Sequence, residues 1–291
     1  MVQFLGLQDL HQSIRRMYSI GYALLFRLTS NRCISMVVYD IPASYNSLVV
    51  CGNIHGEFKT LLYNLKRFQI ENTVVVVAGD CGIGFEKPNH YDQLYCKLSV
   101  SLEKLNLLFL LIRGNHDDPS YFDGKRLDYP RMKAIPDYSV IKFKEHNTLC
   151  IGGAISIDRT LRLEAMWSDK VKGRTVKNLY WENEQASYDE TSLSSLKSSN
   201  LKIDTVITHT APSFCYPLAK NGISTWLAMD SKLEADLLHE RQQMDKIYKH
   251  LKADLHPVES WYYGHFHDSH TEYIENTRFT LLNIDELKVI F

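Results

Sequence analysis

The sequence carries a scattered set of carboxylate, amide and imidazole groups, which are donors that divalent metal ions take from proteins. The candidate donors are Asn53, His55, Asp80, Asn115, His209, His265 and His267. None of them is a cysteine, which argues against a structural zinc site. Asp80 supplies the only carboxylate, and its two oxygens can bridge two ions. Because two ions about 3.5–4 Å apart can clamp a phosphoryl group and activate water, the set predicts a hydrolytic dinuclear metal site.

Each donor segment follows a short apolar run that predicts a buried strand. The runs cover residues 48–50, 74–77, 107–112, 205–208 and 261–263. Short apolar runs bounded by glycine are typical of the buried strands of an α/β sheet. Helices are expected over about 57–68 and 91–105, and this βαβαβ alternation indicates parallel strands with right-handed crossovers. We therefore expect the donors to gather at strand ends.

The remaining sequence predicts one domain, residues 41–291, after an N-terminal extension of residues 1–40. Within the domain we expect short strands over 140–157, a polar irregular stretch over 158–200 with a helix near 190–197, a long helix over 231–251, and two or three strands after Thr271. Apolar residues of the extension recur at helical spacing and predict an amphipathic helix. Its apolar stretch is too short to span a bilayer.

Composition limits the class of protein. The 291 residues are 45% hydrophobic and 23% charged, as in ordinary globular proteins. The formal charge of −1 gives no global field toward extended nucleic acid or an anionic membrane. The six cysteines form no C-x-x-C pair, which favours a reducing compartment. We therefore expect a cytoplasmic protein with no membrane or extended nucleic-acid contact, and leave protein partners open.

Taken in order, the donor segments resemble the motifs of calcineurin-like metallophosphoesterases. That signature runs D-x-H, G-D, G-N-H-[DE], a lone His and G-H-x-H. The matching segments are Asn53-Ile54-His55, Gly79-Asp80, Gly114-Asn115-His116-Asp117, His209 and Gly264-His265-Phe266-His267. The resemblance covers residues from about 47 to 268. It implies an α/β fold, a four-layer αββα sandwich of two mixed β-sheets flanked by helices, with the metal site at the strand ends.

The resemblance also implies roles for individual residues. One ion would be held by Asn53, His55, Asp80 and His267, and the other by Asp80, Asn115, His209 and His265. A hydroxide on the metal would attack phosphorus in line while His116 protonates the departing oxygen. Asp117 would support the loop, and Arg113 and Arg159 are candidates for a cationic phosphate contact. The two divalent ions would be Mn, Fe, Zn, Ni or Co, with Mn favoured.

The sequence departs from the family pattern at three places. Asn53 stands where the first motif normally begins with Asp, which predicts weaker binding of the first ion and tighter binding in Asn53→Asp. The protein Ser/Thr phosphatases of the superfamily have Asp and Arg where this chain has Ile83 and Gly84. Asp117 replaces their Glu. These differences weaken the case for a phosphoprotein substrate.

We therefore expect a phosphomonoesterase acting on a phosphorylated small molecule or nucleotide. A phosphodiesterase or dinucleoside-polyphosphate hydrolase is the enzymatic alternative. A non-catalytic scaffold on a degenerate phosphoesterase fold is the other class. The stretch containing Arg159, Arg162, Trp167 and Trp181 could line a substrate pocket or form an ordinary loop over the sheet edge, and the sequence leaves both open.

Overall fold

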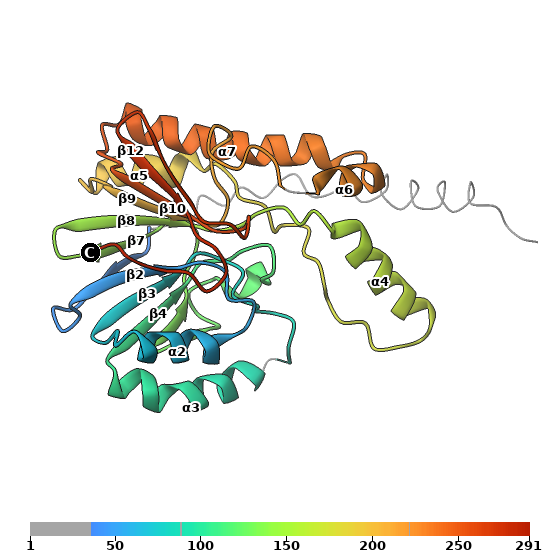
Figure 1. The fold of residues 1–291 in the computed structure, drawn as a ribbon, viewed down its shortest axis with the longest axis horizontal. Coiled ribbons are helices and arrows are strands. Elements are labelled where there is room, and N and C mark those ends of the chain that lie inside the picture. The colour runs from blue at the N-terminus through green and yellow to red at the C-terminus, as the bar shows by residue number, and fades with distance from the viewer. Residues whose placement is uncertain (1–35, 88, 221) are drawn as a thin grey trace, which may run out of the picture. The chain divides into compact units, whose positions relative to one another are not determined.

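The computed structural model describes residues 36–87, 89–220 and 222–291. The predicted helix of the N-terminal extension lies outside the described residues. Residues Met36–Phe291 form one compact unit in which two β-sheets pack face to face with helices on their outer faces (Figure 1). The predicted fold class, two mixed sheets flanked by helices, is confirmed. The first strand, β1 (Val38–Asp40), pairs with β7 (Ser139–Phe143), so the sheet begins within the residues that we assigned to the extension.

One sheet has six strands in the order β13-β2-β3-β4-β6-β5. Its strands are β2 (Ser47–Cys51), β3 (Thr73–Val77), β4 (Leu107–Leu111), β5 (Asp128–Tyr129), β6 (Met132–Ala134) and β13 (Leu287–Val289). The central strands β2, β3, β4 and β6 are parallel, and the two edge strands are antiparallel to their neighbours. Helices α2 (Phe58–Arg67) and α3 (Asn89–Lys104) cover the outer face, as the βαβαβ pattern predicts.

The other sheet has seven strands in the order β1-β7-β8-β9-β10-β12-β11. Its further strands are β8 (His146–Ile151), β9 (Thr205–Thr208), β10 (Ser260–Tyr263), β11 (His270–Ile274) and β12 (Thr277–Leu281). Helices α5 (Glu190–Ser198) and α7 (Leu233–Ala253) pack on its outer face. Further described elements are the short helix α6 (Ile223–Met229) and a 3-10 turn at Pro119–Tyr121.

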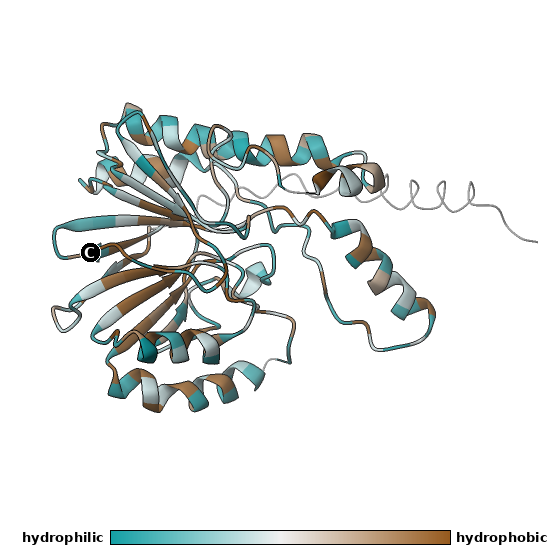
Figure 2. Cartoon of the chain, in the orientation of Figure 1, coloured by the Kyte–Doolittle hydropathy of each residue, from teal (hydrophilic) through white to brown (hydrophobic). Residues whose placement is uncertain are grey.

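Side chains on the central strands alternate between two cores. Val74 and Val76 belong to the core between the sheets, whereas Val75 and Val77 belong to the core under α2 and α3. Successive residues of a strand point to opposite faces, so a strand covered on both faces must be apolar at every position. This explains why the strands appear in the sequence as continuous runs, and in Figure 2 as brown arrows.

The prediction of an irregular stretch from 158 to 200 was wrong at its start. Helix α4 (Arg159–Val171) lies there and contains no fully buried residue. Its apolar residues Leu163, Trp167 and Val171 recur at helical spacing, but all three are exposed. Arg159 ties the helix to Asp230 and Asp236, at N–O distances of 2.6 and 2.7 Å. Among the described helices, none has the length and apolar character that crossing a membrane requires.

Candidate metal centre

The candidate donors come from loops at the carboxyl ends of strands in both sheets. β2, β3 and β4 deliver them from one sheet, and β9 and β10 from the other. His55, Asp80, His265 and His267 have positive φ angles of 43°, 50°, 68° and 55°. Such angles are uncommon for residues other than glycine and cluster at functional sites, where the surroundings hold them. After β2, β3 and β10, the chain therefore makes an abrupt turn that presents a donor.

Glycines of the motifs allow these turns to approach closely. Gly79 has a φ of +90°, and a Cβ there would overlap the ring of His209. A Cβ on Gly114 would overlap Oδ1 of Asp80. The glycine requirement therefore comes from loops of separate strands packing directly on one another around Asp80.

Four buried donors converge at what we call the inner position. Nε2 of His209 lies 3.1 Å from Oδ1 of Asp80 and 3.1 Å from Oδ1 of Asn115. Nδ1 of His265 lies 2.9 Å from the same Asn115 oxygen. Nδ1 of His209 lies 2.7 Å from the carbonyl oxygen of Ala78, to which it donates, so the Nε2 lone pair is directed into the site. These four residues are the set that the resemblance implies for the second ion.

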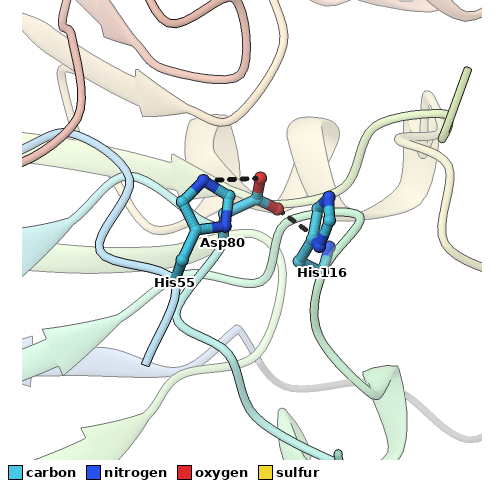
Figure 3. Close-up of side chains that lie close together, drawn as sticks. All are labelled: His55, Asp80 and His116. Carbon is cyan, nitrogen blue, oxygen red and sulfur yellow. Dashed lines mark hydrogen bonds and ion pairs between the residues drawn. The ribbon is translucent and has the colours of Figure 1, made fainter. Parts of the chain in front are cut away.

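A more open group of donors forms what we call the outer position. Nε2 of His55 lies 3.2 Å from Nε2 of His267 and 4.0 Å from Oδ2 of Asp80. Figure 3 shows Asp80 between His55 and His116, and one donor atom from each of the three lies within 4.8 Å of the others. His55 is half-buried and His267 is exposed. The structure thus brings together His55, Asp80 and His267, as the resemblance implies for the first ion.

Asn53 is buried beside these donors but faces them with its amide nitrogen. Nδ2 donates to Oδ2 of Asp80 at 3.0 Å, and Oδ1 accepts the backbone N–H of His265 at 3.0 Å. The side chain therefore links the bridging carboxylate to the loop after β10.

The electrostatics of the cluster suit a divalent cation. Burial alone would raise the pKa of Asp80, but the charge of His209 and its hydrogen bond hold it well below the usual value. Burial lowers the pKa of His265, and it lowers that of His267 to about 4, so both are neutral near pH 7. Although burial opposes it, Asp80 raises the pKa of His209. A divalent ion would bind the neutral imidazole, because metal ligands bind deprotonated. The residues at both positions therefore fit divalent metal ions, with the inner one better enclosed.

Asp117 holds the two motif loops of the six-stranded sheet together. Its carboxylate accepts the backbone N–H groups of Cys81 at 3.0 Å, Ile83 at 2.8 Å and Gly114 at 2.7 Å. Burial and the nearby charge of Asp80 raise the pKa of Asp117 to about 7, and the three backbone donors oppose that rise.

Asn115 is aimed by two residues that the sequence analysis missed. Its Nδ2 donates to Oγ of Ser156 at 3.1 Å, and that hydroxyl donates to Oε2 of Glu184 at 2.8 Å. With the amide nitrogen so bound, the amide oxygen faces the inner position. Ser156 follows β8, so the rule that donors gather at strand ends could have found it. No sequence signal pointed to Glu184.

Two cationic side chains lie beside the donors. Nη2 of Arg162, on α4, lies 2.7 Å from Nε2 of His116, and its Nε pairs with Asp158 at 2.9 Å. Nζ of Lys220 donates to the carbonyl oxygen of His265 at 3.2 Å. Burial lowers the pKa of His116 to about 4 and outweighs Asp80, which opposes it.

The two arginines named from the resemblance have other partners. Arg113 is buried and pairs with Asp137 at 2.8 Å, and it also donates to backbone carbonyls of the 183–185 segment. Arg159 pairs with Asp230 and Asp236. Arg162, by contrast, lies against the ring of His116.

The site and fold together define a metal-binding α/β sandwich, and comparison with known proteins assigns its family. The sequence matches the calcineurin-like phosphoesterase family over residues 47–269, which is more than half of the chain. The protein therefore belongs to the calcineurin-like phosphoesterase family. Membership supports the metal-dependent hydrolysis of phosphate esters.

Solved structures agree on the fold. TT1561 of Thermus thermophilus is 12% identical with a TM-score of 0.50, and the match covers 84% of this chain and 98% of that one. A dimetal phosphatase from Danio rerio is 12% identical with a TM-score of 0.43, covering 82% of this chain and 86% of the other. No curated protein matches the sequence significantly. At 12% identity, the likeness to TT1561 shows the fold alone.

Proposed function

We propose that this protein is a metal-dependent phosphomonoesterase acting on a small molecule or a nucleotide. The observation that carries the proposal is the convergence of Asp80, Asn115, His209 and His265 at one buried point, with His116 beside it. The site would take two divalent ions, with Mn favoured among Mn, Fe, Zn, Ni and Co. Such ions supply a hydroxide nucleophile near neutral pH and neutralise charge on the phosphate.

His116 would serve as the proton donor to the leaving oxygen, and the negative charge of a bound phosphate would raise its lowered pKa. Its backbone N–H donates to Oδ1 of Asp80 at 2.8 Å, which fixes the residue beside the bridging carboxylate. Its ring lies at the edge of the donor cluster and is half-buried. A proton donor in this place can reach a phosphate oxygen that does not contact the ions.

The charges around the site favour a monoester over a diester. Arg162 contacts the ring of His116 and Lys220 contacts the carbonyl of His265, so two fixed cations lie beside the metal donors. A phosphomonoester carries up to two negative charges, whereas a phosphodiester carries one. Positive groups beside the phosphate would therefore bind the monoester more strongly than the diester.

A neighbouring cavity offers room for the leaving group. It has a volume of about 400 Å³, and its lining includes Phe85, Lys87, His90 and Lys177. Phe85 connects it to the site, since its ring centroid lies 6.3 Å from that of His116 and 5.1 Å from that of Trp181. This volume and its mixed lining suit a sugar or nucleoside.

One observation favours the scaffold alternative, namely that Asn53 turns an amide nitrogen toward the site. Turnover of metal-stripped protein, titrated with Mn²⁺, decides between the two. We expect hydrolysis of p-nitrophenyl phosphate to rise with metal, to exceed hydrolysis of the bis-ester, and to be lost in His116→Ala but kept in the exposed control His239→Ala. Bound metal with no turnover of either ester would refute the enzymatic proposal.

A further inference from the structure

The orientation of the Asn53 amide is fixed by its two partners. Oδ1 faces the backbone N–H of His265, which can only donate, and Nδ2 faces Oδ2 of Asp80, which accepts when ionised. Reversing the amide would place two donors together and two acceptors together. Since Asn53 is fully buried, no solvent is at hand to satisfy the reversed groups.

The amides of Asn53 and Asn115 therefore have opposite orientations beside the carboxylate of Asp80. Asn115 binds Ser156 through its amide nitrogen and directs its oxygen to the inner position. Asn53 binds a backbone N–H through its oxygen and directs its nitrogen to Asp80. An amide NH₂ group has donors only and offers no lone pair to a metal ion.

The two positions consequently differ in their protein donors. The inner position has Oδ1 of Asp80, the amide oxygen of Asn115 and the imidazoles of His209 and His265. The outer position has Oδ2 of Asp80 and the imidazoles of His55 and His267. That carboxylate oxygen also accepts a hydrogen bond from the amide of Asn53. The inner donors are buried, whereas His267 is exposed to competing water.

The charges at the site increase the difference in metal affinity between the two positions. Asp80 is the one carboxylate among the donors, so the donor set offers two divalent ions a single negative charge. Two dications about 3.5–4 Å apart repel one another strongly at any effective dielectric constant of a protein interior. Lys220 adds positive charge nearby, whereas Arg162 is paired with Asp158. The first ion to bind therefore lowers the affinity of the site for a second ion.

We propose that the two positions have unequal affinity: one ion is retained at the inner position, and the outer position takes a second ion only weakly. Asn53 is then a positioning residue that fixes Asp80 against the loop carrying His265. The inference rests on the metal site of the proposed function but does not depend on catalysis.

The test is a count of bound metal. Protein loaded with Mn²⁺ would be dialysed against metal-free buffer and its metal measured by mass spectrometry, and re-addition of Mn²⁺ would be followed by calorimetry. We expect one retained ion per chain and a second with at least about tenfold weaker affinity. In Asn53→Asp we expect two retained ions, whereas the matched control Asn200→Asp, in an exposed loop, should retain one.

Further variants keep the test decisive if Asn53→Asp folds poorly. His267→Ala should keep the retained ion, and His265→Ala should lose it, with folding of each checked by circular dichroism. Two equally tight ions in the unaltered protein, or loss of the retained ion in His267→Ala, would overturn the inference. Failure of the proposed function shows separately, as one retained ion without turnover.

Discussion

Replacing Arg162 with Gln tests whether this side chain binds the phosphate group of the substrate. The Arg162 side chain is 10% exposed, and its guanidinium lies 2.7 Å from Nε2 of His116. A hydrogen bond to a charged group contributes about 1.5–3 kcal/mol. Its removal should therefore lower kcat/KM about 10- to 150-fold, at roughly 1.4 kcal/mol for each factor of ten. Arg162→Lys should recover part of the loss, because Lys keeps the charge but not the planar fork.

Steady-state hydrolysis of p-nitrophenyl phosphate, together with competitive inhibition by orthophosphate, measures the effect. Arg174 provides a matched control, because its side chain is 67% exposed and its only ion pair in the described structure is a loose one with Asp169, at 3.6 Å. We expect Arg174→Gln to behave as the unaltered protein. The reasoning is refuted if folded Arg162→Gln retains kcat/KM and orthophosphate inhibition within about twofold of the starting protein, since no contact of the stated strength could then be lost.

Three further predictions concern the groups behind the site. Ser156→Ala should weaken retention of the inner ion about 10- to 100-fold, because it releases the amide of Asn115; competition with a metal-binding dye measures this, and an unchanged affinity would contradict it. Asp117→Asn should destabilise the fold by about 1–3 kcal/mol, because its NH₂ group would face at least one of three buried backbone N–H donors. Denaturant unfolding measures this change, and an unchanged midpoint would contradict the prediction. Burial and the charge of Glu184 raise the pKa of Glu240 to about 8. A carboxyl group with a raised folded-state pKa contributes stability that is fully present below its unfolded value and is lost as pH rises through its folded value. The free energy of unfolding should therefore fall between about pH 4.5 and 8 by an amount on the order of 3 kcal/mol or more. Glu240→Gln should flatten that fall, since Oε1 has no partner to lose; an equal slope in both proteins would count against the assignment.

The parts of the fold that the sequence predicted well are those fixed by burial on both faces. The apolar runs at 74–77 and 261–263 correspond to the strands Thr73–Val77 and Ser260–Tyr263. Such runs are easy to recognise, because strands covered by helices on one side and by a sheet on the other must be apolar throughout. Helix α4 was missed although Leu163, Trp167 and Val171 recur at helical spacing, because it buries no residue fully and lies in a stretch rich in polar residues.

The site was predicted as a set of donors but not as a geometry. The candidate ligands lie together at the strand ends, as the order of the motifs indicates. The direction of the Asn53 amide could not be predicted, since it depends on the backbone of His265, 212 residues away in the sequence. The contact between Arg162 and His116 could not be predicted either, because it depends on the position of α4, a helix with no buried face.

The position of α4 explains how the site can lack an arginine in its second motif. Gly84, which stands where the Ser/Thr phosphatases have Arg, has a φ of +107°, and a Cβ there would overlap the Cβ of Asp118. No long side chain can start from that loop without moving its neighbours. Arg162 reaches His116 from α4 instead, while Arg159, one turn earlier, holds that helix to Asp230 and Asp236. On the proposed function, the phosphate-binding charge would therefore come from a helix and not from the loop after β3. Because that helix is held mainly by ion pairs, weakening them should reduce phosphate binding without changing the metal count.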